Sequence, residues 1–309
     1  MTRRPPTNLA ASVHDRLLAR ARTEGRPFDE LLQYYVIERF LYRLSRSRHS
    51  DRLVLKGALM LQFWGGPLSR STRDIDLMRA SSATVERMVE IVRDILAAKV
   101  VDDGLQFDAD SLRGESIRVE AEYHGVRLTC RAVLGKAVVR LQVDVGFGDA
   151  ITPRAREILY PSLLDFEPAK LLGYVPETAV AEKLQAMVVL DMANSRMKDF
   201  FDIWLLATKR QFAGALLRDA LRATFARRRT DLPGATPVAL TPAFSQDREK
   251  QMQWRAYLRK ARVRGEAPPL REVADLIASF VMPAVESGRL GARFDRRWPP
   301  GGPWLSRGG

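Results

Sequence analysis

The amino-acid sequence predicts an α+β fold with N-terminal helices, a central unit that combines a mixed sheet with helices, and a helical C-terminal part. Three observations lead to this prediction. Apolar side chains recur at helical spacing over residues 9–48, short alternating segments typical of strands occupy residues 105–147, and helical spacing returns over residues 177–286. The chain has 309 residues, of which 46% are hydrophobic, and this length allows one or two domains.

The first half of the chain alternates helices and strands. Residues 9–24 and 28–48 form two amphipathic helices, which are joined near Gly25-Arg26-Pro27. A central unit over residues 53–150 then contains a helix, a strand and a second helix over 83–98. Further strands are expected near residues 105–109, 116–123, 126–132 and 138–147.

The second half of the chain is predicted to be helical. Residues 150–168 precede it as a loop, because proline occurs there three times. Helices are expected at about residues 177–192, 197–209, 213–228, 245–263 and 270–286. The proline-rich stretch 233–242 is interpreted as a surface linker, and residues 291–309 as a poorly ordered tail rich in Gly, Pro and Arg. The predicted domains therefore span residues 1–150 and 151–290.

The composition narrows the class of protein. No run of about twenty apolar residues could cross a membrane, and Arg3 and Arg4 are followed by prolines instead of the apolar core of a secretory signal. Cys130 is the single cysteine, so no internal disulfide or cysteine metal cluster can form, and we expect it to act as a small apolar strand residue. These features favour a cytoplasmic protein.

The most informative stretch is residues 56–78. Asp74 and Asp76 are separated by one residue on a predicted strand, so their side chains point to the same face. Two neighbouring carboxylates repel unless a cation lies between them, and a hard divalent ion such as Mg²⁺ suits such oxygens. Gly57 and Ala58 open the preceding helix and could offer backbone N–H groups to a phosphate. A metal site beside a phosphate site indicates phosphoryl or nucleotidyl transfer, although two exposed aspartates in a loop are common.

A third carboxylate is expected on the strand over residues 138–147. Asp144 lies late in this strand, on the face opposite Val139, Leu141, Val143 and Val145, where a further metal ligand would be placed. The alternative is an ordinary aspartate that faces solvent. Asp149 is the second choice, although its position after Gly146 and Gly148 is more typical of a turn.

Two later helices carry the remaining candidates. Lys183 flanks the apolar stripe of the helix over residues 177–192, where a lysine either extends outward or reaches an anion. Asp199 and Asp202 are three residues apart on the next helix and share one face. Lys198 is one turn before Asp202 and could simply form a surface pair with it.

These blocks together resemble the AbiEii, or MenT-like, nucleotidyltransferase toxins, which belong to the DNA polymerase β-like superfamily. The matching segments are VLKGALML…RSTRDIDL, LQVDVGFGD, AVAEKLQAM and SRMKDFFDIWLL, and the N-terminal stretch from Ala11 to Tyr42 is also similar. Here Ala58 stands where that superfamily usually has Ser, so a phosphate would meet only backbone donors.

The resemblance implies a site and a reaction. It assigns Asp74, Asp76 and Asp144 to Mg²⁺ or Mn²⁺, and it places Asp199 and Asp202 among the catalytic residues. It assigns nucleotide binding to Gly57, Ala58, Arg70, Thr72, Lys183 and Lys198. The implied enzyme transfers a nucleotide from a nucleoside triphosphate to RNA, with the tRNA 3′ end as acceptor, and so blocks translation. It implies a cognate AbiEi-like antitoxin partner, a role in phage defence and no membrane association.

The formal net charge of +13 is distributed unevenly. Residues 1–56 hold 12 basic and 6 acidic side chains, residues 57–209 hold 19 and 22, and residues 210–309 hold 19 and 9. Basic flanking regions suit a polyanion such as RNA, although plain solvation by arginine is the alternative. The candidate RNA-binding residues are Arg227, Arg228, Arg229, Arg255, Arg259 and Lys260. Trp254 and Tyr257 could stack on an RNA end, but core packing is the more ordinary role for helix aromatics.

Two alternative functions remain open on the sequence alone. The same chemistry could modify a small molecule or a protein side chain instead of RNA. A protein that binds nucleic acid without catalysis is the second alternative, and in that case the aspartates would be structural.

Overall fold

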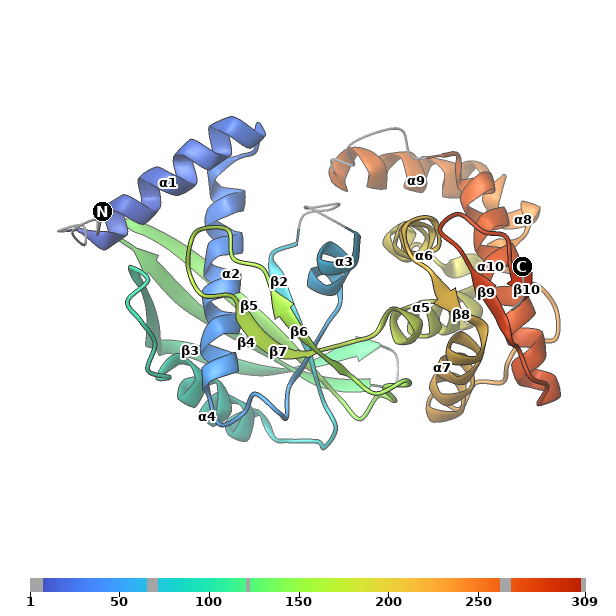
Figure 1. The fold of residues 1–309 in the computed structure, drawn as a ribbon, viewed down its shortest axis with the longest axis horizontal. Coiled ribbons are helices and arrows are strands. Elements are labelled where there is room, and N and C mark those ends of the chain that lie inside the picture. The colour runs from blue at the N-terminus through green and yellow to red at the C-terminus, as the bar shows by residue number, and fades with distance from the viewer. Residues whose placement is uncertain (1–7, 66–71, 121–122, 262–267, 307–309) are drawn as a thin grey trace. The chain divides into compact units, whose positions relative to one another are not determined.

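A computed structural model describes residues 8–65, 72–120, 123–261 and 268–306 (Figure 1). The chain forms two compact units. The first unit contains Met1–Leu59, Thr72–Gly148 and Arg156–Gly173, and the second contains Met60–Ser71, Asp149–Ala155 and Tyr174–Gly309. The segment Arg156–Gly173 therefore belongs with the first unit, whereas the sequence placed it in a C-terminal domain that begins at residue 151.

A seven-stranded sheet forms the centre of the first unit, in the order β3-β4-β5-β2-β1-β7-β6. Its strands are β1 (Val54–Lys56), β2 (Asp74–Arg79), β3 (Leu105–Glu120), β4 (Tyr123–Leu134), β5 (Ala137–Phe147), β6 (Arg156–Tyr160) and β7 (Ala169–Gly173). β2 is parallel to β5 and β1 is parallel to β7, whereas the other neighbours are antiparallel. This mixed sheet with flanking helices confirms the predicted α+β fold class.

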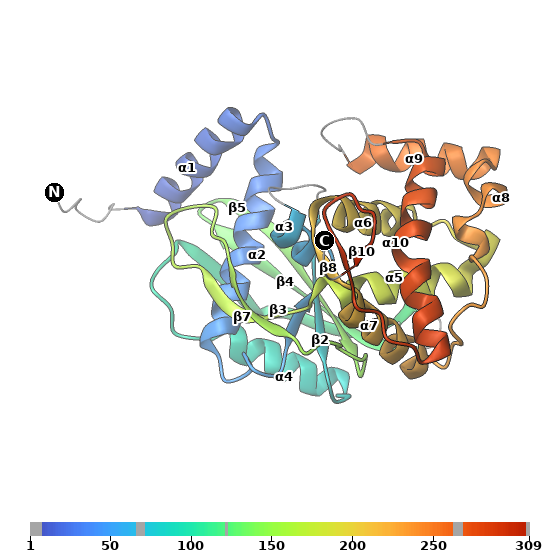
Figure 2. The same cartoon turned by 45° about the vertical axis from the view of Figure 1, so that its right-hand side comes forward.

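Three helices of the first unit are α1 (Leu9–Glu24), α2 (Phe28–Arg46) and α4 (Val85–Leu96). Each of α1 and α4 begins at a side-chain cap, because Asn8 accepts the Ala11 N–H and Thr84 accepts the Arg87 N–H. α2 packs against β5 and β7, and α4 packs against β3 and β4 (Figure 2). The boundaries of α1 and α2 agree closely with the predicted helices.

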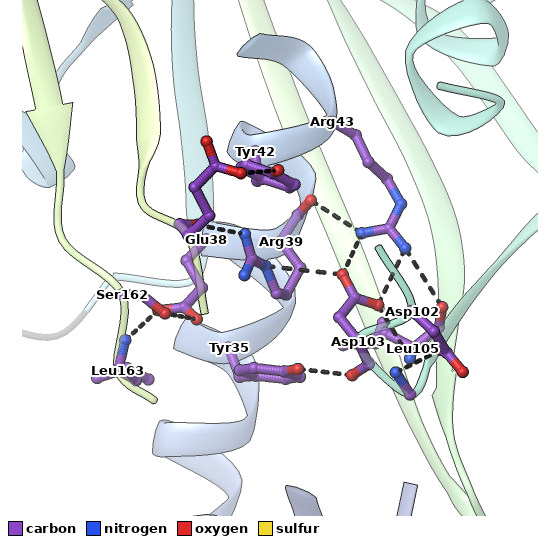
Figure 3. A network of polar contacts seen from close by, with 12 residues as sticks. Tyr35, Glu38, Arg39, Tyr42, Arg43, Asp102, Asp103, Leu105, Ser162 and Leu163 are labelled. Atoms are coloured by element: carbon purple, nitrogen blue, oxygen red, sulfur yellow. Dashed lines mark hydrogen bonds and ion pairs between the residues drawn. The ribbon is translucent and has the colours of Figure 1, made fainter. Parts of the chain in front are cut away.

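Buried charges connect α2 to the segment before β3 (Figure 3). Arg43 donates to both carboxylate oxygens of Asp103, at 2.6 and 3.0 Å. The Tyr35 hydroxyl donates to the backbone carbonyl of Asp103 at 2.6 Å. Buried polar groups need hydrogen-bond partners, so this network holds α2 beside the segment that leads into β3.

Glu38 connects α2 to the segment after β6. Its carboxylate accepts hydrogen bonds from the Ser162 hydroxyl at 2.8 Å and from the Leu163 N–H at 2.6 Å (Figure 3). Burial raises the pKa of Glu38 to about 7, although these two hydrogen bonds and the nearby Arg39 act in the opposite direction.

The second unit is mainly helical. Its main helices are α5 (Pro176–Leu190), α6 (Met197–Lys209), α7 (Gly214–Arg227), α9 (Arg248–Ala261) and α10 (Leu270–Leu290), close to the predicted helices. The shorter elements are η1 (Asp191–Ala193), η2 (Val238–Leu240) and α8 (Pro242–Ser245). α3 (Ala58–Gly65) follows β1 along the chain. None of the described helices is long and apolar enough to cross a membrane.

The C-terminal segment is ordered, in contrast to the predicted tail. β9 (Arg296–Trp298) pairs with β8 (Phe212–Ala213) and with β10 (Leu305–Ser306) in a small antiparallel sheet. Trp298 is buried and donates its indole N–H to the Ala207 carbonyl at 2.8 Å. Trp304 donates to the Phe280 carbonyl at 2.9 Å and stacks on the Phe280 ring. These two tryptophans hold a Gly- and Pro-rich segment that composition alone indicated to be disordered; residues 307–309 lie outside the described residues.

Residues 150–168, which were predicted to form a loop, contain a strand. This strand, β6, pairs with β7 along its whole length, from Arg156 opposite Gly173 to Tyr160 opposite Ala169. The strand predicted near 105–109 and the first part of the strand predicted near 116–123 belong to the single strand β3, whose pairing with β4 shifts register between Asp108 and Arg113. Residues 121 and 122 lie outside the described residues, and Tyr123 begins β4.

Candidate active site

The turn between β1 and α3 places Gly57 against Asp76. Gly57 has a φ of +72°, in the left-handed region that favours glycine. A Cβ atom at this position would lie 2.0 Å from Oδ2 of Asp76 and 2.7 Å from its Cγ. The backbone of Gly57 therefore supports the Asp76 carboxylate, and only a glycine leaves room for it. Ala58, the next residue, is buried at the start of α3.

Charged residues form one row across five strands of the sheet. Asp76 on β2 is the register partner of Asp144 on β5 and of Lys56 on β1. Asp144 is in turn opposite Arg127 on β4, which is opposite Glu115 on β3. Register partners on neighbouring strands project to the same face of a sheet, so these five side chains share one face. The sequence did not predict that Arg127 and Lys56 would join the aspartates.

This charged row lies on the face opposite α4. A Cβ atom at Gly114 of β3 would meet the side chains of Val85 and Val89 on α4, so the face to which Gly114 points is the face that α4 covers. Leu128 and Val143 continue that covered row along the sheet. Because side chains alternate along a strand, the neighbouring row of charges points the other way.

The Arg127 side chain donates two hydrogen bonds to the Asp144 carboxylate. Its Nε donates to Oδ1 at 2.9 Å and its Nη2 donates to Oδ2 at 2.8 Å, and the Gln142 amide donates more weakly to both oxygens at 3.4 Å. These hydrogen bonds raise the pKa of Arg127, and the charges of Asp144, Asp74 and Glu115 raise it further, so the guanidinium stays charged. Both oxygens of Asp144 therefore already have a cationic partner.

The oxygen donors suit Mg²⁺ by type, since Asp74 and Asp76 share one face of β2 and Asp144 lies opposite Asp76. Within the described part of the chain, however, no group of three or more His, Cys, Asp or Glu side chains is arranged to hold a metal ion. The three carboxylates therefore fit a divalent ion by the chemistry of their oxygens, and the metal roles of Asp74, Asp76 and Asp144 stay predictions.

Lys183 on α5 contacts two buried carboxylates of α6. Its ammonium lies 2.6 Å from Oδ1 of Asp199 and 2.7 Å from Oδ2 of Asp202. Arg196 holds the second oxygen of Asp199 at 2.7 Å. Burial raises the pKa of Asp199, but Lys183 and Arg196 together outweigh it, and the pKa lies below its usual range. Lys183 thus pairs with two carboxylates of its own chain, and its predicted role in binding a triphosphate stays a prediction.

The family model of the nucleotidyl transferase AbiEii toxin, Type IV toxin–antitoxin system, matches residues 39–276 of the 309 residues. The chain belongs to this family. It is accordingly a nucleotidyltransferase, and its Type IV toxin–antitoxin family implies an antitoxin partner. The alternative of a regulator without catalytic activity is thereby excluded.

Two crystal structures are similar to this AbiEii-family chain. One is provisionally described as a nucleotidyltransferase from H. pylori; it shares 13% identity at a TM-score of 0.49, over 86% of this chain and 98% of the other. The second is JHP933 from Helicobacter pylori, with 14% identity and a TM-score of 0.47, over 85% of this chain and 94% of the other. No curated protein matches the chain.

The other nucleotide-binding candidates of this AbiEii-family chain have different surroundings. The Thr72 N–H donates to the Tyr34 hydroxyl at 3.0 Å, and the Thr72 hydroxyl is within 3.4 Å of the Asp74 backbone, so Thr72 positions the start of β2. Lys198 is exposed on α6. Arg70 lies outside the described residues.

Arg228 corrects the prediction that three consecutive arginines bind RNA. Its guanidinium is buried, donates to the Gln185 side chain at 3.0 Å, and lies 3.4 Å from Asp149 and 3.9 Å from Glu182. Arg228 is therefore a structural residue, and Asp149 is its partner. The flanking Arg227 and Arg229 are exposed, as are three candidates on α9, namely Arg255, Arg259 and Lys260. Trp254 is buried, which agrees with the packing role.

Two signals in the sequence could have indicated the missed cations. Arg127 occupies the polar phase of the alternating strand from Val126 to Ala132, opposite the phase of Leu128 and Cys130. Lys56 directly precedes Gly57. Neither signal reveals that both cations join the aspartates, because that depends on strand order and register.

Proposed function

We propose that this AbiEii-family enzyme transfers a nucleoside monophosphate from a nucleoside triphosphate to RNA, with the tRNA 3′ end as the acceptor. The observation that carries the proposal is the pairing of Asp76 with Asp144 across β2 and β5, with Asp74 on the same face. Family membership supports the transfer of a nucleotide. A toxin that extends tRNA would stop aminoacylation and so translation, and such a protein would act in the cytoplasm and in phage defence.

The residues of the sheet support the proposed reaction. Asp74 and Asp76 would hold Mg²⁺, and Gly57 fixes the Asp76 carboxylate by close approach. When bound, the ion lowers the pKa of an attacking hydroxyl and offsets charge on the triphosphate. An RNA 3′-hydroxyl then attacks the α-phosphorus, the bond to the leaving oxygen breaks, and pyrophosphate departs while the hydroxyl proton leaves to solvent. Lys183 remains a proposed triphosphate-binding residue.

RNA is favoured as the acceptor by the excess of basic side chains in the C-terminal part of the chain and by their exposure. Residues 210–309 hold 19 basic and 9 acidic side chains, and Arg227, Arg229, Arg255, Arg259 and Lys260 are exposed among them. Lysine and arginine on a surface bind phosphates without regard to base sequence. A small-molecule acceptor would not need these charges.

The test is incorporation of each labelled nucleoside triphosphate into total RNA by the wild-type protein and by Asp76→Asn. We expect transfer by the wild type and a loss of at least about 100-fold in the variant, since a preorganised charged group is removed. The variant should retain the wild-type unfolding midpoint, because the side chain keeps its volume. Equal incorporation by both proteins would refute the proposed metal site, and label on a small molecule or protein instead of RNA would refute the acceptor.

A further inference from the structure

Arg127 pairs with Asp144 and is also partly open to solvent. Its guanidinium contacts both oxygens of Asp144, which is the register partner of Asp76, and Asp74 shares the face of Asp76 on β2. Yet the Arg127 side chain is 34% exposed, against 16% for Asp144. A partly exposed arginine can turn away from its partner without unfolding the strand that carries it. A ligand that binds the guanidinium can therefore replace Asp144 as the partner of Arg127.

A cation at the carboxylates competes with Arg127 for the same oxygen atoms. Arginine stays protonated at any physiological pH, so a divalent ion at Asp144 would repel the guanidinium, and the two cations compete for the charge of one carboxylate. If the guanidinium of Arg127 moved into water, its two charge-assisted hydrogen bonds with Asp144 would be lost without an equivalent in the protein. An anion that presents two oxygens in a plane would replace those bonds, and a phosphate group does so.

A second arginine on β4, Arg131, also pairs with an aspartate. Arg131 donates through Nε and Nη2 to Asp108, at 3.1 and 2.6 Å. Its register partner on β5 is Arg140, which lies beyond the residues that pair with β2. Both donors of Arg131 go to Oδ2 of Asp108, whereas Arg127 contacts both oxygens of Asp144. Of these two arginine–aspartate pairs on β4, the pair of Arg127 is the one that adjoins Asp74 and Asp76.

We propose that Arg127 is a positioning residue that exchanges Asp144 for a phosphate group of the incoming nucleoside triphosphate. Without nucleotide, Arg127 holds Asp144 and keeps it from a metal ion. With nucleotide, the guanidinium pairs with phosphate oxygens, and Asp144 is released to the ion beside Asp76. The proposal rests on the proposed nucleotidyl transfer and adds to it an order of assembly: the metal ion binds tightly only together with the nucleotide.

The test measures Mn²⁺ binding to the full chain by electron paramagnetic resonance, with and without a non-hydrolysable α,β-methylene nucleoside triphosphate. For the wild type we expect weak Mn²⁺ binding alone and binding tightened about tenfold or more by the analogue, which corresponds to one charge-assisted hydrogen bond. Arg127→Ala should bind Mn²⁺ alone about tenfold more tightly than the wild type, bind the analogue more weakly, and lose most of the coupling.

Arg131→Ala is the matched control and should retain wild-type binding of both ligands. Arg127→Lys serves if the alanine variant does not fold; one ammonium cannot hold both oxygens, so Mn²⁺ alone should bind more tightly while part of the coupling remains. Unchanged Mn²⁺ binding and coupling in a folded Arg127 variant would overturn the proposal. So would an Arg127 variant that loses Mn²⁺ binding, since the arginine would then support the site. A wild-type protein that binds neither Mn²⁺ nor the analogue would instead refute the proposed function.

Discussion

Replacement of Gly57 by alanine tests whether close backbone approach fixes Asp76. Two unfavourable effects combine at this position. A φ of +72° costs an L-residue about 1–2 kcal/mol, and the new Cβ would lie 2.0 Å from Oδ2 and 2.8 Å from Cβ of Asp76. Overpacking of this kind costs about 1–3 kcal/mol more, because Asp76 must leave its rotamer or β2 must shift. We therefore expect Gly57→Ala to lower the free energy of unfolding by about 2–5 kcal/mol.

Gly135 provides the matched control. It has a φ of +59° in the turn between β4 and β5, and a Cβ atom there would meet nothing within 4 Å. Gly135→Ala should therefore show only the backbone effect of about 1–2 kcal/mol. The loss of unfolded-chain entropy is common to both variants and cancels in the comparison.

The assay pairs urea denaturation with incorporation of labelled nucleotide into RNA. Gly57→Ala should lose most of its activity under conditions where it is still folded, because Asp76 is displaced, whereas Gly135→Ala should stay active. If Gly57→Ala is no less stable than Gly135→Ala and remains active, Asp76 does not depend on this contact, and our reading of the turn is wrong.

Two further predictions concern pH and salt. The folded-state pKa of Glu38 is raised from 4.5 to about 7, so its contribution to stability is fully present below pH 4.5 and is lost as the pH rises through 7, by up to about 3 kcal/mol. Urea denaturation at pH 5 and pH 7.5 should show this loss in the wild type and not in Glu38→Gln; equal pH dependence in both proteins would contradict the assignment. RNA affinity should fall steeply with salt, and reversal of the exposed Arg227 and Arg229 to Glu should weaken RNA binding and flatten the dependence while nucleotide binding is retained. Coinciding salt curves would show that these two arginines do not contact RNA.

Local patterns in the sequence predict most of the fold. Amphipathic spacing marks α1, α2, α5 and α6 because one stripe of each helix is apolar, and alternation marks β4 and β5 because each has one covered face. β6 was missed because it is five residues long and lies between prolines that favour a loop. The ordered tail was missed because its anchors are two tryptophans whose partner, Phe280, is distant in sequence.

Part of the candidate site is likewise visible in the sequence, and part depends on how the strands pair. The spacing of Asp74 and Asp76 follows from the period of a strand and is visible in the sequence. The approach of Asp144 to Asp76, and of Arg127 to Asp144, depends on which strands pair and in which register, and no local pattern encodes this. Burial of Arg228 between two exposed arginines likewise depends on what packs against α7.

The row of charges across the sheet also has an electrical consequence. Glu115, Asp144 and Asp76 carry three negative formal charges and Arg127 and Lys56 carry two positive ones; Asp74 adds one more negative charge, which gives these six side chains a formal charge of −2. One divalent ion balances that charge. A second ion would give this group of six side chains and two ions a net positive charge unless an anion arrived with it, and a nucleoside triphosphate is such an anion. In a two-ion state, Arg127 and Lys56 would thus make the charge balance of these six side chains depend on the substrate.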